Sequence, residues 1–206
     1  VYNLEISDLQ GHGLKGPRVD LSQLNHLPGC IDVWEISWKE FCFRLPPLII
    51  EEQLQGAAPH PEITVFVPFN EEGIDLMNAE FDRIHPIVDI GGGPVLFFPL
   101  NSKLITAPYL RLPEIERSFF LGLLRRADPP TQDRIAEQIN DNESLYERIL
   151  EVGGVRYLPD TLPENIDFWR HHFGAQWPEL MKLKSRFDPD GILTGSFGQY
   201  LISSND

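Results

Sequence analysis

Cysteine is scarce in this chain. Cys30 and Cys42 are the two cysteines among 206 residues. Two are too few for a disulfide framework, and their spacing does not match a metal site. We therefore expect two buried free thiols, in a redox compartment that the sequence leaves open.

Positive charge is also in short supply. Lys and Arg number 17 against 31 Asp and Glu, which gives a net charge of −14. This balance argues against nucleic acid or an anionic membrane as a partner, because both are bound by clustered basic residues. Arg125-Arg126 and Lys182 to Arg186 are local exceptions at predicted helix ends, where they complement the helix dipole. No apolar run approaches the roughly 20 residues of a membrane span, so we expect a soluble protein.

The familiar catalytic motifs are missing as well. The chain has no nucleophile elbow, P-loop, His-Glu-x-x-His segment or paired cysteines. His171 and His172 are adjacent on a predicted helix, so their imidazoles diverge and cannot share a metal. Gly91-Gly-Gly93 precedes a predicted strand, which favours a tight turn over a phosphate site. On motifs alone, the chain is a substrate-binding or interaction domain, or part of an enzyme whose chemistry lies elsewhere.

The hydrophobic pattern predicts an α+β domain with a mainly antiparallel sheet covered by helices. It does not predict the order of the strands. The strands are expected to be half exposed. The start of the chain reads as the middle of a strand, so we expect a piece of a longer polypeptide. Strands are expected at 1–6, 63–68 and 94–100, a strand or buried segment at 114–126, and helices at 71–84, 131–152, 163–173 and 177–187. A further short helix is expected after Ser37, with Glu40 at the capping-box position.

The last predicted helix should end at Asp188, because the residue before Pro189 is pushed out of the α region. The turn that follows should deliver Ile192 and Leu193 into a core. The order Lys-x-x-Phe-Asp-Pro-x-x-Ile-Leu in this segment resembles the closing segment of flavin oxidases of the vanillyl-alcohol-oxidase type.

Five further segments resemble the cytokinin dehydrogenases. They are His60 to Pro68, Gly93 to Ser102, Phe119 to Leu124, Tyr157-Leu158-Pro159, and Trp169 to Trp177 with its Trp-x-x-His-Phe-Gly-x-x-Trp pattern. The resemblance implies that residues 1–206 form a ferredoxin-like substrate or cap domain, incomplete at its N-terminus. It also implies the cofactor FAD, held mainly by an FAD-binding domain that this chain lacks, so the fragment alone is not expected to be active.

The resemblance also assigns roles to single residues. Leu158 falls on the position that packs over the planar substrate, and Tyr157 and Gln199 fall on positions near the flavin. Glu62 and Thr64 stand where the family, whose substrates are N6-substituted adenines, has Trp and Asn. We therefore expect either oxidation of an amine or alcohol on a different, more polar substrate, or a diverged homologue. Without the resemblance, residues 157–159 read as a loop packed on the sheet.

The implied reaction is oxidation of a C–N bond by hydride transfer to the flavin. Two alternatives stay open. One is a stand-alone small-molecule-binding or interaction module without catalytic activity, and the other is a dehydrogenase whose FAD-binding domain is supplied by another chain.

Overall fold

The computed structural model describes residues 34–43, 58–158, 161 and 165–193. The chain forms two compact units, 1–55 and 56–206. Within the first, α1 (Trp38–Phe43) begins at the predicted capping box: the Ser37 hydroxyl accepts from the Glu40 N–H at 3.2 Å, and the Glu40 carboxylate accepts from the Ser37 N–H at 2.8 Å. Cys42 is exposed, not buried as expected. Cys30 and the strand predicted at 1–6 lie outside the described residues.

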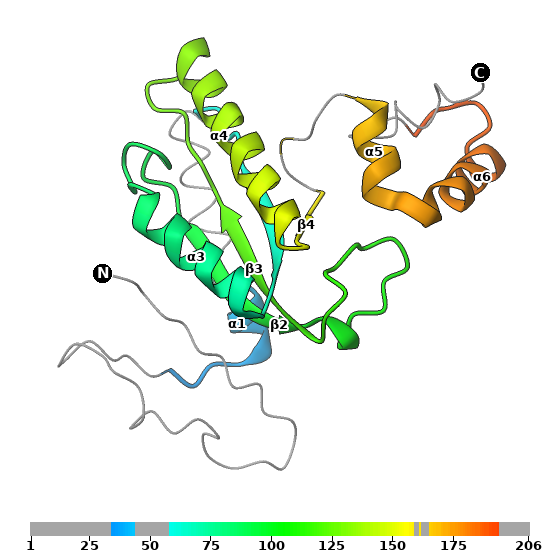
Figure 1. The fold of residues 1–206 in the computed structure, drawn as a ribbon, viewed down its shortest axis with the longest axis horizontal. Helices are drawn as coiled ribbons and strands as arrows, with labels where there is room; N and C mark the ends of the chain where they lie inside the picture. The colour runs from blue at the N-terminus through cyan, green and yellow to red at the C-terminus, as the bar shows by residue number, and fades with distance from the viewer. Residues whose placement is uncertain (1–33, 44–57, 159–160, 162–164, 194–206) are drawn as a thin grey trace. The chain divides into compact units, whose positions relative to one another are not determined.

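The second unit is a four-stranded antiparallel sheet with two helices on one face (Figure 1). Its strands have the order β2-β3-β1-β4, and the chain runs β-α-β-β-α-β, which is the ferredoxin-like topology. This confirms the α+β prediction. The elements are β1 (Ile63–Pro68), α3 (Glu71–Arg83), β2 (Val95–Asn101), β3 (Arg117–Leu123), α4 (Gln132–Glu151) and β4 (Val155–Arg156).

The core lies between the sheet and the helices α3 and α4. Ile63, Val65 and Val67 of β1 point into it and meet Met77 of α3 and Ile149 of α4. These β-branched residues favour a strand because they fit the pleated surface. All six residues of β1 are buried, in contrast to the half-exposed strands expected. Ile63, Val65 and Val67 pack in the core, and on the other face Phe66 packs against the rings of Phe120 and Tyr157.

Gly91 and Gly93 let the turn before β2 approach the chain that leaves β3. A Cβ on Gly91 would lie 2.0 Å from the Arg126 carbonyl oxygen, and one on Gly93 would lie 1.8 Å from that of Leu124. Gly91 also has a φ of 70°, which side chains rarely adopt. The triple glycine is therefore the tight turn that the sequence predicts.

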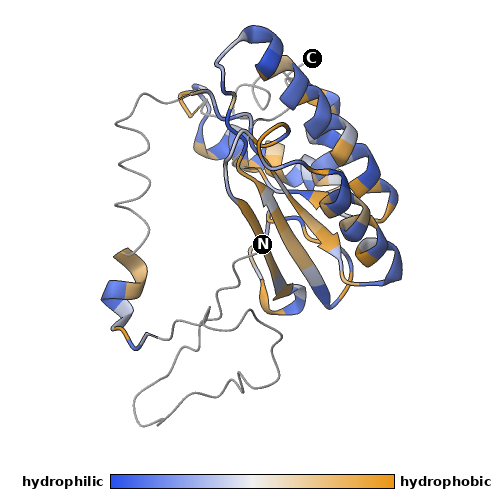
Figure 2. Ribbon diagram, turned by 90° about the vertical axis from the view of Figure 1, so that its left-hand side faces the viewer, coloured by the Kyte–Doolittle hydropathy of each residue, from blue (hydrophilic) through white to orange (hydrophobic). Residues whose placement is uncertain are grey.

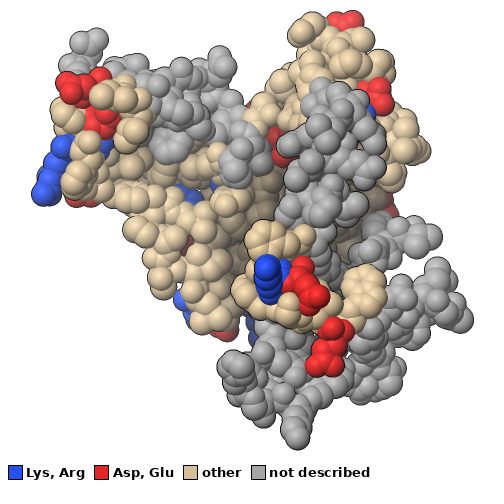
Figure 3. All heavy atoms as spheres, turned by 180° about the vertical axis from the view of Figure 1, so that it is seen from behind, with Lys and Arg blue, Asp and Glu red and all other residues tan. Residues whose placement is uncertain are grey.

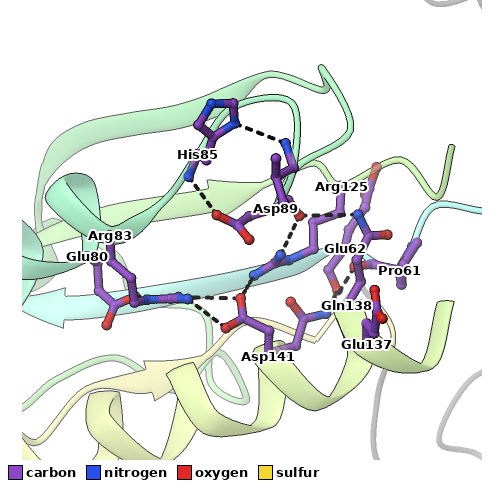
Figure 4. A network of polar contacts seen from close by, with 12 residues as sticks. Pro61, Glu62, Glu80, Arg83, His85, Asp89, Arg125, Glu137, Gln138 and Asp141 are labelled. Carbon is purple, nitrogen blue, oxygen red and sulfur yellow. Dashed lines mark hydrogen bonds and ion pairs between the residues drawn. The ribbon is translucent and has the colours of Figure 1, made fainter. Parts of the chain in front are cut away.

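A buried ion pair joins α4 to the end of β3 (Figure 4). Arg125 is 1% exposed; it pairs with Asp141 of α4, and its Nη1 donates to the Asp89 carbonyl at 2.6 Å. The sequence placed Arg125 at a helix end, but it follows β3. Burial alone would raise the pKa of Asp141, yet the hydrogen bond from Arg83 and the charge of Arg125 outweigh it and hold the pKa below its usual value.

Arg83 extends this ion pair into a chain of charges between the two helices. Its Nη1 donates to Asp141 at 2.8 Å and its Nη2 to Glu80 at 2.7 Å. Glu80 is buried and also accepts from Arg148 Nε at 2.7 Å. Since Glu80 and Arg83 belong to α3 while Asp141 and Arg148 belong to α4, the network fixes how the helices lie on the sheet.

Two shorter helices follow the sheet: α5 (Ile166–Phe173) and α6 (Trp177–Phe187), joined by a 3-10 turn at Gly174–Gln176. The end of α6 just before Asp188 is as predicted. The Asp188 carboxylate accepts from the N–H groups of Ile192 and Leu193 at 2.7 and 2.9 Å. Ile192 and Leu193 are nevertheless 76% and 69% exposed, so the prediction that they enter a core was wrong. Polar bonds to Asp188 build this turn.

His172 on α5 is buried beside other positive groups. Its ring stacks on Phe168, with centroids 5.9 Å apart. Burial lowers the pKa of His172 to about 4, and the charges of Arg111, His171 and Arg156 act in the same direction. His171 is exposed, so the two imidazoles diverge as predicted. In the part of the chain that the structure describes, no helix is both long and apolar enough to cross a membrane.

We predict that Asp141→Asn lowers the free energy of unfolding by about 3 kcal/mol, because Arg125 is left buried without its counter-ion. Chemical denaturation at neutral pH measures this loss. Glu137→Gln is the matched control, since Glu137 is exposed on the same helix and pairs with Arg134 at 3.4 Å. The control should change stability by less than about 0.5 kcal/mol, and equal losses in the two variants would contradict the assignment.

We also predict that stability falls as the pH drops from the ordinary His value of 6.5 to about 4. In this window the unfolded chain binds a proton at His172 and the folded chain does not, so the proton favours unfolding. His172→Phe should remove on the order of 2 kcal/mol of this dependence. Denaturant midpoints measured across the window give the result, and a slope unchanged in the variant would show that another group is responsible.

Candidate functional site

The sheet has a second face, on the side away from α3 and α4 (Figure 2). Successive side chains of a strand point to opposite faces. Because Val65 of β1 and Leu121 of β3 point into the core, Thr64, Phe66 and Phe120 point the other way. The register of β2 adds Phe98, which pairs with Phe120. We call this surface the helix-free face.

Four aromatic rings form a continuous cluster on the helix-free face. Phe98 stacks on Phe120 with centroids 4.4 Å apart and planes at 14°. Phe66 meets Phe120 edge-on at 5.6 Å and Tyr157 at 5.4 Å. Phe120 and Tyr157 lie 6.0 Å apart. In Figure 3, which is seen from the side opposite α3 and α4, most of the described surface is uncharged. The cluster is therefore apolar, with Phe98 46% exposed at its surface and Phe66 buried within it.

Tyr157 and Thr64, two of the predicted site residues, lie together on this face. The Tyr157 N–H donates to the Thr64 carbonyl at 2.8 Å. This hydrogen bond extends the pairing of β4 with β1 by one residue beyond Arg156. Thr64 is buried, and its hydroxyl oxygen lies 3.5 Å from the position of a Cβ on Gly122. The missing side chain of Gly122 thus leaves a methyl-sized space beside the hydroxyl, bounded also by Leu96 and Phe120. Leu158 is the next residue after Tyr157 and is half-buried in a turn.

Glu62 and Gln199 are less closely tied to the cluster. Glu62 precedes β1, and its side chain is 30% exposed and lies 3.6 Å from His60 Nδ1. It has the same alternation as Thr64 and Phe66, which places it at the rim of the helix-free face. Gln199 lies outside the described residues. Four of the five predicted residues therefore lie just before β1, within it or directly after β4.

The ring cluster itself was missed at the sequence level. Phe66, Phe98 and Phe120 come from three strands, and only the strand order and register bring them together. Their signal in the sequence was an aromatic residue at the same alternation in each predicted strand. This signal can be interpreted only when it is known which set of alternate residues in each strand faces the helices.

Elsewhere, the described residues offer little chemistry for a site. A shallow hollow of about 310 Å³ is lined by Phe69, Ile115, Glu116 and Arg117, and it contains none of the predicted site residues. Among residues 34–43, 58–158 and 165–193, no group of three His, Cys, Asp or Glu side chains is placed to hold a metal ion. The helix-free face is therefore the stronger candidate for a binding surface.

Comparison with known proteins agrees with the resemblance read from the motifs. The family model described as "Cytokinin dehydrogenase 1, FAD and cytokinin binding" matches residues 17–201. An uncharacterized oxidoreductase, ORF5 of the fasciation locus of Rhodococcoides fascians, is 32% identical over 142 residues, which cover 68% of this chain and 31% of that protein. Cytokinin dehydrogenase 5 of Oryza sativa subsp. japonica is 28% identical over 191 residues, covering 86% and 34%.

The chain matches one part of each of these relatives. Cytokinin dehydrogenase 3 of Arabidopsis thaliana is 26% identical over 174 residues, or 83% of this chain and 32% of the relative. The chain thus spans about a third of the length of the curated relatives it matches. Since the family model covers most of its residues, the chain belongs to the cytokinin dehydrogenase family, within the region that the family description assigns to FAD and cytokinin binding.

Proposed function

We propose that this chain is the substrate-binding cap of an FAD-dependent oxidoreductase that oxidises the C–N bond of a small, flat amine. The observation that carries the proposal is the ring cluster of the helix-free face, which includes Tyr157. Leu158 is the next residue along the chain. A flat apolar surface can hold a planar ring parallel to itself, and such orientation lowers the barrier of a transfer reaction.

The described residues fit one part of FAD. The apolar helix-free face suits contact with a flat ring system, and Tyr157 is the described residue that the resemblance assigns to the flavin side. The triple-glycine turn leads into β2, so it provides no helix N-terminus for phosphates. The phosphates would be held by an FAD-binding domain, in the same or another chain. When bound, FAD supplies the acceptor for the hydride that leaves the substrate carbon.

The chain's own residues would bind and orient the substrate. Leu158 packs over the substrate ring and excludes water, and Phe66 and Phe120 support Tyr157 from behind. Thr64 is buried next to the space left by Gly122, where its hydroxyl can donate or accept one hydrogen bond. These residues would position the substrate. The group that accepts the substrate's proton would come from the FAD-binding domain.

Glu62 and Thr64 support a substrate more polar than an isoprenoid adenine. Glu62 provides a partly exposed carboxylate at the rim, where an aromatic side chain would provide an apolar wall. A carboxylate only accepts hydrogen bonds, so it favours a substrate that carries a donor or a positive group. We therefore propose an amine with a hydroxyl or amino substituent on its side chain.

The visible spectrum of the polypeptide that carries this chain, expressed from its longest reading frame, tests the proposal. Flavin bands that bleach when an amine substrate is added would support it. Flavin bands that ignore an isoprenoid adenine but bleach with a more polar N6-substituted adenine would support the polar substrate as well. A colourless protein that binds neither FAD nor adenines would contradict the proposal and favour the stand-alone interaction module.

We predict that Leu158→Ala in the flavin-bound polypeptide lowers kcat/KM by about tenfold or more, because it opens the surface over the substrate ring. The melting temperature should change little, since Leu158 is half-buried in a turn. Leu150→Ala, a partly exposed leucine on α4, is the matched control and should keep wild-type turnover. Wild-type turnover in Leu158→Ala would remove Leu158 from the site.

We predict that Glu62→Trp improves kcat/KM for an isoprenoid adenine by several-fold, because the ring restores an apolar wall. Glu62→Gln is the companion variant: it removes the charge without adding a ring, so it separates the two effects. Steady-state turnover with a polar and an isoprenoid adenine gives the comparison. If neither variant shifts the preference between the two substrates, Glu62 does not face the substrate.

A further inference from the structure

Gly122 is a glycine that neither backbone conformation nor close packing requires. It lies in β3, where it pairs with Leu96 of β2 and with Thr64 of β1. Each of the other described glycines either has a positive φ or would bring a Cβ to 2.4 Å or less from another atom. A Cβ on Gly122 would lie 3.5 Å from its nearest neighbours, which is an ordinary contact. Because glycine weakens the interior of a strand, Gly122 costs stability without serving the fold.

The position of Gly122 places it within the candidate site. It is on the helix-free face, because its neighbour Leu121 points into the core. The register sets Leu96, Gly122 and Thr64 in one row across three strands, and the hydrogen bond from Tyr157 to Thr64 continues this row onto β4. Glycine in a strand often marks a place where a ligand comes close to the backbone.

The gap left by the missing side chain has one polar wall. The three atoms nearest to the position of a Cβ are Leu96 Cβ, Phe120 Cε1 and Thr64 Oγ1. Thr64 is 4% exposed, and its hydroxyl has no hydrogen-bond partner within the described residues. A buried hydroxyl without a partner is unfavourable. A ligand group that bonds to this hydroxyl would therefore be bound preferentially.

The size of the gap limits what can enter it. Gly122 is itself buried, and the three neighbouring atoms leave room for one methyl-sized group. The gap therefore suits a small group at the edge of a ligand and is too small for a whole ring. The Thr64 hydroxyl can donate or accept a hydrogen bond, so an amino group, a hydroxyl or a ring nitrogen would satisfy it.

We propose that Gly122 is a specificity-determining residue, and that its gap receives a small polar group at the edge of the substrate ring. The Thr64 hydroxyl hydrogen-bonds to that group. This inference rests on the proposed function and deepens it, because it names the residue that sets how closely the substrate approaches the sheet. An alanine at this position fills the gap and separates the polar group from Thr64.

Gly122→Ala in the flavin-bound polypeptide that carries this chain tests the inference. We expect kcat/KM for the amine substrate to fall by about tenfold or more, because the ring is displaced from its reactive position. The melting temperature should rise by about 1 °C or more, because alanine is favoured over glycine in a strand and its methyl group makes ordinary contacts. A residue that serves only the fold would not move the two quantities in these directions.

Gly92→Ala is the matched control. Gly92 lies in the turn before β2, and a Cβ there would meet only Ile87 Cδ1, at 3.9 Å. Its φ of 78° is a conformation that side chains rarely adopt, so alanine introduces strain. This variant should lower the melting temperature and keep the wild-type kcat/KM, which is the reverse of the result expected for Gly122→Ala.

A double variant tests whether Gly122 and Thr64 act on the same group of the substrate. Thr64→Val keeps the branched shape and removes the hydroxyl, so it should also lower kcat/KM by about tenfold. Once alanine at position 122 has displaced the polar group, loss of the hydroxyl should have no further effect. The double variant should therefore match the weaker of the two single variants, whereas independent effects would multiply.

Four results would overturn the inference. Wild-type turnover in Gly122→Ala would remove Gly122 from the site and leave the proposed function intact. A loss of turnover together with a lower melting temperature would show that Gly122 serves packing. Multiplied losses in the double variant would show that Gly122 and Thr64 do not meet one group. A wild-type polypeptide that binds flavin but oxidises no amine would overturn both the proposed function and this inference.

Discussion

The burial of β1 on both faces is the constraint on which the rest of the structure depends. One set of alternate residues, Ile63, Val65 and Val67, fills the core under α3 and α4. The other set, Thr64 and Phe66, is buried on the helix-free face. A shift of one residue in the register would exchange the two sets and lose both the core and the ring cluster. The same strand thus contributes to stability and to the proposed binding surface.

The polar network lies on the helix side of the sheet, and the ring cluster lies on the helix-free side. On the helix side, Asp141 joins Arg83 and Arg125, so α4 is tied both to α3 and to the end of β3. On the helix-free side, the strands contribute the rings of the aromatic cluster. A rigid support behind an apolar surface suits a site that must hold a flat ring in one orientation. This arrangement is why we assign the charged residues of the helix side to stability and the helix-free face to binding.

The sequence predicted what depends on near neighbours in the chain. Apolar spacing located α3 and α4, β-branched residues located β1, and Ser37 with Glu40 located the start of α1. It did not predict partners far apart in the chain. The strand order, the pairing of Arg125 with Asp141 and the stacking of Phe98 on Phe120 all depend on long-range contacts. The exposure of Ile192 and Leu193 was misjudged because apolar residues after a turn usually enter a core, whereas here Asp188 holds their backbone.

The central claim is that the helix-free face lies against bound flavin and substrate. Hydroxyl-radical footprinting of the polypeptide that carries this chain, with and without FAD, tests it most directly. The claim predicts that oxidation of Tyr157 and Leu158 falls when FAD binds. Oxidation of Ile74 and Leu150, which are partly exposed on α3 and α4, should stay the same. Unchanged oxidation of Tyr157 and Leu158, or protection of Ile74 and Leu150 instead, would contradict it.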